Sequence, residues 1–198
     1  MRDLPTHPIT FEEFLEWCDS ETRAEWVNGK VVLLSPVSSS HDRIVKFLIK
    51  TLGEYIDRHG LGELFGQPFS MRLRTSLREP DLFFVPRPLL SLVTDKYYDG
   101  AAALAIEVVS PESVERDRLE KPVEYAGGGV EEYWLVDPME STAEFYALTG
   151  DARYERIPLD DHGVFHSRVV EGFFLRPEWL WQTTVLRTWD VRRELGIE

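Results

Sequence analysis

The chain has 198 residues, of which 22 are Lys or Arg and 35 are Asp or Glu, so the formal net charge at pH 7 is -13 with neutral histidines. Hydrophobic residues make up 43% and charged residues 29%, which is ordinary for a folded protein and excludes a disordered chain. One domain spanning residues 1–198 can bury a substantial core. No apolar run approaches the ~20 residues that cross a bilayer. The N-terminal residues also lack the apolar stretch of a secretory signal, so a cytoplasmic location is expected.

Two further features limit the chemistry. Cys18 is the single cysteine, so neither an intrachain disulfide nor a cysteine-based zinc site can form. The acidic balance argues against a protein that coats nucleic acid by charge alone, although it leaves room for a local basic strip.

The first half of the chain predicts helices, a hairpin and strands. Thr10 and Glu13 have capping-box spacing, which predicts a short helix over residues 9–18. Asn28-Gly29 lies between two apolar runs and predicts a tight hairpin. Apolar residues at helical spacing then predict a long helix, capped by Ser40, from His41 to about His59. Residues 63–75 and 81–86 are expected to be strands.

The second half alternates strands with a helix. Residues 104–109 form an apolar run typical of a central strand, and a helix is expected from about Asp117 to Ala126, where three glycines stop it. A buried strand at 133–137 and a hairpin of 143–148 with 153–158 follow, before a loop-rich C-terminal third that ends in a short polar segment. This order of elements predicts an α/β (α+β) domain with a mixed sheet.

One carboxylate interrupts the run at 104–109. Glu107 stands among five apolar residues, where a buried charge must be protonated, paired or metal-bound. The alternative is a Glu at a strand end that reaches solvent.

Two more residues gain meaning beside Glu107. Asp81 follows Pro80 at the entrance of a strand, although Pro-Asp is also common in turns. Lys121 lies one turn into the next helix, where a solvated lysine is the ordinary interpretation, and Asp117 with Glu120 has capping-box spacing. Together, two carboxylates and a lysine suit phosphodiester cleavage that depends on Mg²⁺ or Mn²⁺.

The sequence resembles the Uma-type restriction endonuclease family, within the PD-(D/E)XK nuclease superfamily, over nearly the whole chain. The matching blocks are residues 25–30, Ser35-Pro36 with His41, Glu79-Pro80-Asp81, residues 106–111, Arg116-Asp117 with Lys121, Tyr125, and residues 129–138.

The resemblance implies a restriction-endonuclease-like core, with a central mixed sheet flanked by helices, an N-terminal hairpin and a β-rich C-terminal extension. It implies that Asp81, Glu107 and the backbone carbonyl of Val108 bind the metal, with Asp81, Glu107 and Lys121 catalytic. The sequence departs from the superfamily pattern at Val109, where a lysine is usual, so Lys121 is expected to supply the ammonium from the following helix. Pro122 could displace Lys121 if that helix begins before Asp117.

Three residues form a second tier. Glu25 could join the metal ligands, since the superfamily often adds an acidic residue from the N-terminal region. His41 could contact phosphate, or could simply face water at the start of its helix. Gln67 could orient water from a strand, although a structural role is the more ordinary interpretation.

Other features have plainer interpretations. Tyr133, Trp134, Phe83 and Phe84 are expected in the core rather than as platforms for bases. A basic strip along the entrance is expected from Arg72, Arg74, Arg78, Arg116 and Arg118, with a solvated edge strand as the alternative.

The leading hypothesis is therefore a Mg²⁺-dependent DNA endonuclease. A non-catalytic binding or assembly module that retains the fold is the main alternative, and a glycosidase-like carboxylate pair is a weaker one. A homodimer is expected because double-strand cleavage needs two sites. The apolar segment 173–181 is a candidate interface, or else a cap on the sheet.

Overall fold

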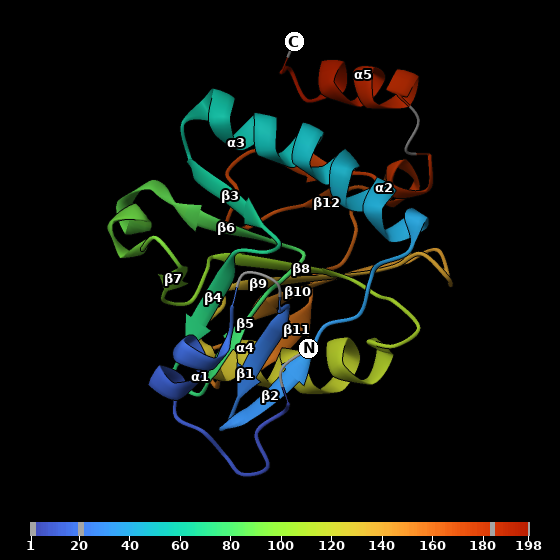
Figure 1. Ribbon diagram of the computed structural model, residues 1–198. Coiled ribbons are helices and arrows are strands. Elements are labelled where there is room, and N and C mark those ends of the chain that lie inside the picture. The colour runs from blue at the N-terminus through green and yellow to red at the C-terminus, as the bar shows by residue number, and fades with distance from the viewer. Residues whose placement is uncertain (1–2, 20–21, 183–184, 198) are drawn as a thin grey trace.

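The computed structural model describes residues 3–19, 22–182 and 185–197, and its centre is a six-stranded mixed sheet (Figure 1). The strand order is β11-β10-β9-β8-β6-β3, and β8 and β9 are the parallel pair within it. The strands span β3 (Gly62–Gly66), β6 (Leu82–Pro86), β8 (Leu104–Val108), β9 (Glu132–Asp137), β10 (Thr142–Leu148) and β11 (Tyr154–Arg156). The expected α/β fold with a mixed sheet is confirmed.

A second sheet of five strands packs on one face of the central sheet. Its order is β2-β1-β5-β4-β7, and its strands are β1 (Ala24–Val27), β2 (Lys30–Leu33), β4 (Ser70–Leu73), β5 (Ser76–Arg78) and β7 (Tyr97–Asp99). The expected hairpin is confirmed: Asn28 and Gly29 form a two-residue turn between β1 and β2, and both have positive φ, as a type I′ turn requires. The short helix α1 (Phe11–Trp17) covers this sheet and has the expected capping box.

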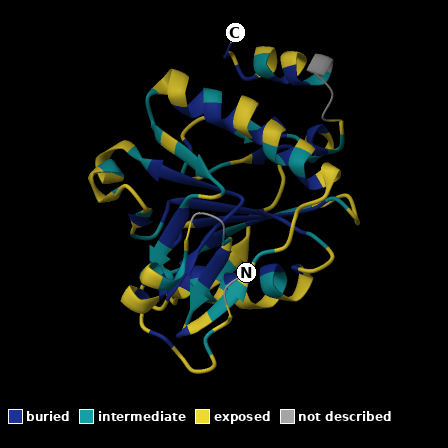
Figure 2. Ribbon diagram, viewed as in Figure 1, coloured by how far each residue is buried: buried dark blue, intermediate teal, exposed yellow. Residues whose placement is uncertain are grey.

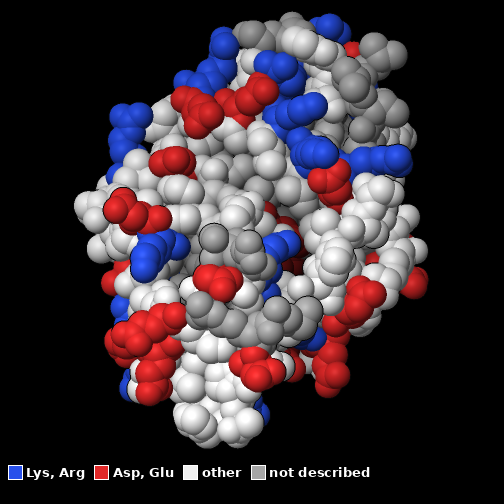
Figure 3. Space-filling model, in the orientation of Figure 1, with Lys and Arg blue, Asp and Glu red and all other residues white. Residues whose placement is uncertain are grey.

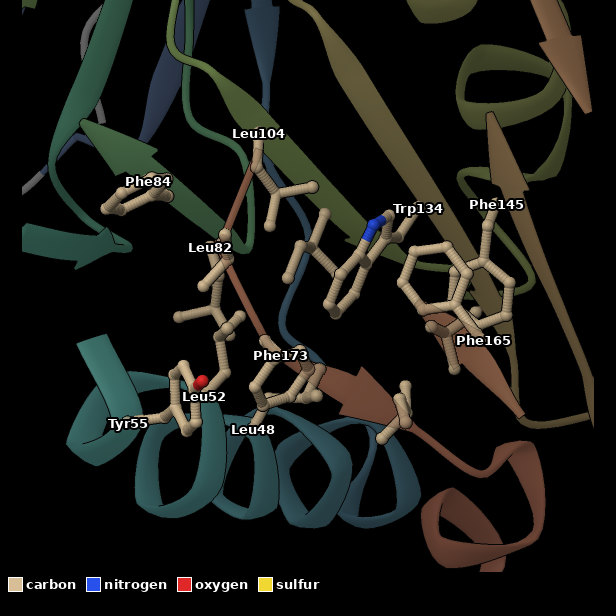
Figure 4. Packing of buried hydrophobic residues seen from close by; sticks show 14 of the residues in the cluster. Leu48, Leu52, Tyr55, Leu82, Phe84, Leu104, Trp134, Phe145, Phe165 and Phe173 are labelled. Atoms are coloured by element: carbon tan, nitrogen blue, oxygen red, sulfur yellow. The ribbon is translucent and has the colours of Figure 1, made fainter. Parts of the chain in front are cut away.

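The opposite face of the central sheet is covered by a long helical segment, made of α2 (Ser39–Leu48), η1 (Ile49–Gly53) and α3 (Glu54–His59). The expected long helix is confirmed, but its cap is Ser38 rather than Ser40, since the Ser38 side chain accepts a hydrogen bond from the His41 amide. Leu48, Leu52 and Tyr55 pack against Leu82, Phe84, Leu104 and Trp134 of the sheet (Figure 4). Buried aromatic and aliphatic side chains therefore fix this helix over β6, β8 and β9.

Alternation along β8 decides where its carboxylate lies. Leu104, Ile106 and Val108 belong to the core under α2, whereas Ala105 and Val109 belong to the core on the other face. Because successive side chains of a strand point to opposite faces, Glu107 lies on the second face, toward the five-stranded sheet and α4 (Lys121–Gly128). Figure 2 shows β8 and β9 buried along their length.

The helix that carries Lys121 differs from expectation at its start. It is already helical at Val114 and Glu115, and then forms the π-helical turn η3 (Arg116–Glu120) before α4. In that turn the Lys121 amide donates to the carbonyl of Arg116, five residues back. This wider turn ends at Glu120, and Pro122 falls in the first turn of α4, where its missing N–H is tolerated, so the proline is accommodated without a break. Asp117 is consequently not a cap, and the expected capping box is wrong.

Two strand predictions also need correction. Residues 63–75 form β3 and β4 in different sheets, because Pro68 interrupts the run and cannot donate to a strand ladder. Gln67 therefore lies in the turn between them, not on a strand.

The C-terminal segment closes the core on the α2 side. It contains β12 (Phe165–His166), β13 (Phe174–Leu175), the 3₁₀ turn η4 (Pro177–Trp181) and the final helix α5 (Val185–Glu194). A second 3₁₀ turn, η2 (Arg87–Leu92), follows β6 earlier in the chain. Phe173, Leu175 and Trp179 are almost completely buried, so these side chains cap the sheet and are not free to form a dimer interface. The chain ends in α5, which the sequence interpretation did not foresee. No helix within the described residues is long and apolar enough to cross a membrane.

Candidate active site

A narrow pocket of about 40 Å³ lies where the first turn of α2, the start of β6, the end of β8 and η3 meet. Its volume has room for only a few water molecules or one hydrated ion. Six of the residues singled out from the sequence line it: His41, Gln67, Asp81, Glu107, Val108 and Lys121. Segments distant in the sequence therefore converge on one small polar space.

Asp81 is held by three donors. Its Oδ2 lies 3.0 Å from Nε2 of His41 and accepts a 2.7 Å hydrogen bond from the backbone amide of Val108. Its Oδ1 accepts a 2.7 Å hydrogen bond from Nε2 of Gln67. Asp81 is 4% exposed, so it is neither a simple turn aspartate nor a solvated one. His41 and Gln67 orient this carboxylate, and His41 does not face water.

Glu107 faces the same pocket from β8. Its Oε1 accepts a 2.7 Å hydrogen bond from the Tyr125 hydroxyl, and its Oε2 lies 2.7 Å from Nζ of Lys121. Burial raises the pKa of Glu107 to about 8, and the charges of Asp117 and Asp81 add to the rise while Lys121 opposes it. The interpretation of Glu107 as a strand-end residue in solvent is therefore wrong.

Lys121 bridges two carboxylates. Its Nζ lies 2.7 Å from Glu107 and 2.9 Å from Oδ1 of Asp117, and the residue is 4% exposed. Burial by itself lowers the pKa of Lys121, but the charges of Glu107 and Asp117 outweigh it and the net pKa is raised. Lys121 is thus a buried, protonated ammonium rather than a solvated side chain, and the early start of its helix does not displace it.

The sequence interpretation missed Asp117 and Tyr125 as members of this site. Asp117, Lys121 and Tyr125 are spaced four residues apart, which places their side chains on one side of a helix. This spacing is the sequence feature that could have identified Asp117 and Tyr125, because a helix that turns Lys121 toward the buried Glu107 of β8 also turns these two residues toward it.

Glu25 is close to the site but does not line the pocket. Its Oε2 pairs with the Arg78 guanidinium at 2.8 Å, and its Oε1 accepts from the Glu79 amide at 3.0 Å. Burial favours a higher pKa for Glu25, but Lys121 and Arg78 outweigh it and the pKa is lowered. Both oxygens of Glu25 are occupied in fixing the segment that leads into Asp81.

The expected basic strip does not form as a unit. Arg78 is buried between Glu25 and Glu124, and Arg118 pairs with Asp137 and Glu144. Arg72 lies over the ring of Phe11 and pairs with Asp99. Arg116 is the member of that set which lines the pocket. The prediction that Tyr133, Trp134, Phe83 and Phe84 lie in the core is confirmed.

The balance of charge in the pocket leaves it suited to a cation. Five carboxylates line it (Glu79, Asp81, Glu107, Glu112 and Asp117), against the three cations Arg23, Arg116 and Lys121. Burial is the main cause of the raised pKa of Glu107 and of Glu79, and neighbouring carboxylates add to it, Asp117 and Asp81 at Glu107 and Glu25 at Glu79. No group of three or more His, Cys, Asp or Glu that could hold a metal is found within the described ranges. Asp81, Glu107 and the Val108 backbone offer oxygen donors of the kind that Mg²⁺ prefers, and Mg²⁺ usually keeps several waters among its six ligands.

A larger cavity, of about 520 Å³, lies on the other side of α4. Tyr133, Tyr146 and Tyr154 line it together with Pro122 and Val123. Asp151 also lines it and pairs with Arg153, but none of the five carboxylates that line the smaller pocket does, so the smaller pocket has the denser set of acidic groups.

The fold and the carboxylate-lysine pocket place the chain in the class of restriction-endonuclease-like α/β proteins. Residues 11–178 match the family model Uma2, described as "Putative restriction endonuclease", and the chain belongs to that family. The fold is similar to a crystal structure described as "a putative nuclease belonging to DUF820 from Anabaena variabilis ATCC 29413". The two share 18% identity with a TM-score of 0.76, and the match covers 89% of this chain and 99% of the other. None of the curated proteins compared with the chain matches it.

Proposed function

We propose that the protein is an endonuclease that hydrolyses phosphodiester bonds of DNA with Mg²⁺ or Mn²⁺. The observation that carries the proposal is the convergence of Asp81, Glu107 and Lys121, from three separate elements, on one polar pocket. Membership of the restriction endonuclease family and the nuclease-like fold support the same conclusion.

Asp81 and Glu107 would hold the cation, with the Val108 carbonyl as a further ligand. A bound divalent cation lowers the pKa of a water ligand and neutralises charge on the phosphate. The chain itself keeps both carboxylates in place: Gln67 and the Val108 amide orient Asp81, and Tyr125 orients Glu107. Val108 lies on the central sheet, Tyr125 on α4, which packs against it, and Gln67 in the turn between β3 and β4.

Lys121 would stabilise negative charge that develops on the phosphate. Its ammonium is a compact point charge in a buried site, where electrostatic interactions are stronger than in water. Asp117 and Glu107 keep the ammonium protonated and fix its position. Lys121 would thus take the role of the lysine that the superfamily pattern has at the position of Val109.

Arg116 would contact the phosphate directly. Arg23 is paired with Glu79, and Lys121 with two carboxylates, whereas Arg116 has no acidic partner among the described residues. Its Nε is also buried without a hydrogen-bond acceptor. An unpaired guanidinium in the pocket suits an oxyanion of the substrate.

The proposal is tested by nicking of supercoiled plasmid in Mg²⁺ or Mn²⁺. The wild type should nick, and Glu107→Gln should lose at least about 100-fold in rate, the scale of removing one group that stabilises a transition state. Glu155→Gln is a matched control, because Glu155 is exposed on β11, and it should nick like the wild type. Circular dichroism should show both variants folded.

The main alternative is a binding or assembly module that retains the fold without catalysis. A wild type that nicks no plasmid with either cation would favour that alternative. A Glu107→Gln variant as active as the wild type would instead overturn the proposed catalytic site.

A further inference from the structure

Three cations form a row on the outer face of α2 and η1. Arg43, Lys46 and Lys50 are all exposed and are spaced at i, i+3 and i+7, which places them on one side of the helix. The opposite side carries Ile44, Phe47 and Leu48, which are buried in the core. The helix is therefore fixed by its apolar side and presents the basic row to solvent.

The row keeps most of its charge available. Lys46 pairs with Asp42 at 2.7 Å, but this pair is exposed on both sides and is weakly held. Arg43 and Lys50 have no ion pair with any residue that the structure describes. Arg43 and Lys50 can therefore bind an anionic group without first breaking an ion pair, and Lys46 can exchange Asp42 for an anion that binds it more strongly.

The position of the row is notable in a chain of net charge -13. Figure 3 shows Lys and Arg gathered over the part of this face formed by α2, α3 and α5, whereas Asp and Glu predominate toward the end formed by α1 and the β1–β2 hairpin. Such a separation of charge creates a local positive potential despite the acidic total.

The row begins two residues after a residue that lines the pocket. Ser35 and Val37, in the loop before α2, line the pocket, and so does His41 in the first turn of the helix. Arg43 is two residues further along. One helix therefore carries a pocket residue, His41, in its first turn and the basic row from Arg43 onward.

We infer that the row binds the phosphates of a DNA duplex beside the bond to be cleaved. This inference rests on the proposed function. Arg43 and Lys50 are separated by about 10 Å along a helix with a rise of 1.5 Å per residue. One DNA strand carries a phosphate about every 3.4 Å along the duplex axis, so the row matches about three phosphates.

The test compares two triple variants with the same net charge. R43Q/K46Q/K50Q removes the row, and K30Q/R74Q/K96Q removes three exposed cations on or beside the five-stranded sheet. Binding of a fluorescent 20-bp duplex is measured by anisotropy in EDTA over a range of salt concentrations, and nicking of plasmid is measured in Mg²⁺.

The row variant should bind at least about tenfold more weakly at low salt, and the slope of log affinity against log salt should become shallower by about 2.7, which is 0.9 for each of three contacts. The control variant should keep the wild-type slope. Equal weakening of both variants would attribute the effect to net charge and overturn the inference.

Measuring both DNA binding and plasmid nicking distinguishes a failure of this inference from a failure of the proposed function. If the wild type nicks plasmid but the row variant binds and nicks like the wild type, the inference fails and the proposed function stands. If the wild type neither binds nor nicks DNA, both fail.

Discussion

The ammonium of Lys121 lies within 3 Å of two buried carboxylates, so three groups that are costly to bury alone are buried together. Each charge is tolerated because the others are present. The pocket still has more acidic than basic groups, and burial, with a smaller contribution from the charges of Asp117 and Asp81, raises the pKa of Glu107 to about 8. The residues that suit catalysis are therefore also residues on which local stability depends.

Lys121→Met tests both roles. Removing one partner of a buried ion pair costs about 3–5 kcal/mol, so the free energy of unfolding measured in urea should fall on that scale. Plasmid nicking should be lost. Because poor folding alone could explain that loss, the double variant D117N/K121M is the control.

The double variant removes one of the two carboxylates left without a counter-ion. It should recover part of the lost stability without recovering nicking. Recovery of both together would show that Lys121 has a structural role only.

At the scale of elements, the close pairing of β3 with β6 depends on Gly62. A Cβ at Gly62 would lie 2.1 Å from the backbone oxygen of Val85, which cannot move without disturbing the ladder. Gly62→Ala should therefore lower the free energy of unfolding by about 2–4 kcal/mol, within the range of substitutions that force a backbone to shift.

Gly127→Ala is the matched control for that prediction. A Cβ there meets nothing within 4 Å, and Gly127 lies in α4. Alanine should be neutral or stabilise the protein by up to about 1 kcal/mol, as in an exposed helix. Equal destabilisation by both substitutions would contradict the contact argument.

Glu132 joins the start of β9 to the loop before β13. It accepts hydrogen bonds from Nε1 of Trp134, Oγ of Ser167 and the Arg168 amide. In Glu132→Gln, an amide group must oppose one of these donors, so a loss of about 1–3 kcal/mol is expected. Glu131→Gln, at the exposed neighbouring position, should change the stability little.

The difference in stability between the wild type and Glu132→Gln should depend on pH, and the raised pKa of Glu132 fixes the direction of that dependence. Burial raises the pKa of Glu132, so the folded protein holds this proton more firmly than the unfolded chain does. The stability that Glu132 contributes should therefore fall as the pH rises from its ordinary pKa toward the raised one. The difference in unfolding midpoint between wild type and Glu132→Gln should be largest near the acid end of that range, and a constant difference would contradict the assignment.

The sequence predicts most of these elements and part of the site. Local signals were sufficient for the α1 capping box, the Asn28-Gly29 hairpin and the apolar run around Glu107, and the family resemblance named Asp81, Glu107 and Lys121. The π-helical turn was not predictable, because Pro122 signals a disturbed helix without saying how it is accommodated. The roles of Arg78 and Glu25 also depend on an ion pair between β5 and β1, which are neighbours in the sheet but far apart in the sequence, so no local pattern predicts it.

For the whole molecule, homodimerisation remains a prediction. The side chains of Phe173 and Trp179 belong to the core, so they are not free to form an interface. Sedimentation equilibrium distinguishes the 23.0 kDa chain from a species of twice that mass. A monomer at all concentrations, with plasmid nicked in one strand only, would contradict the expectation of paired sites.

The central claim is that Asp81 and Glu107 together hold a divalent cation. Titration calorimetry with Mn²⁺ tests it most directly, on the wild type, Asp81→Asn, Glu107→Gln and the exposed control Glu155→Gln. The account predicts a cation-binding isotherm for the wild type and the control, and its loss in both site variants. Unchanged Mn²⁺ binding in folded Asp81→Asn and Glu107→Gln would contradict it.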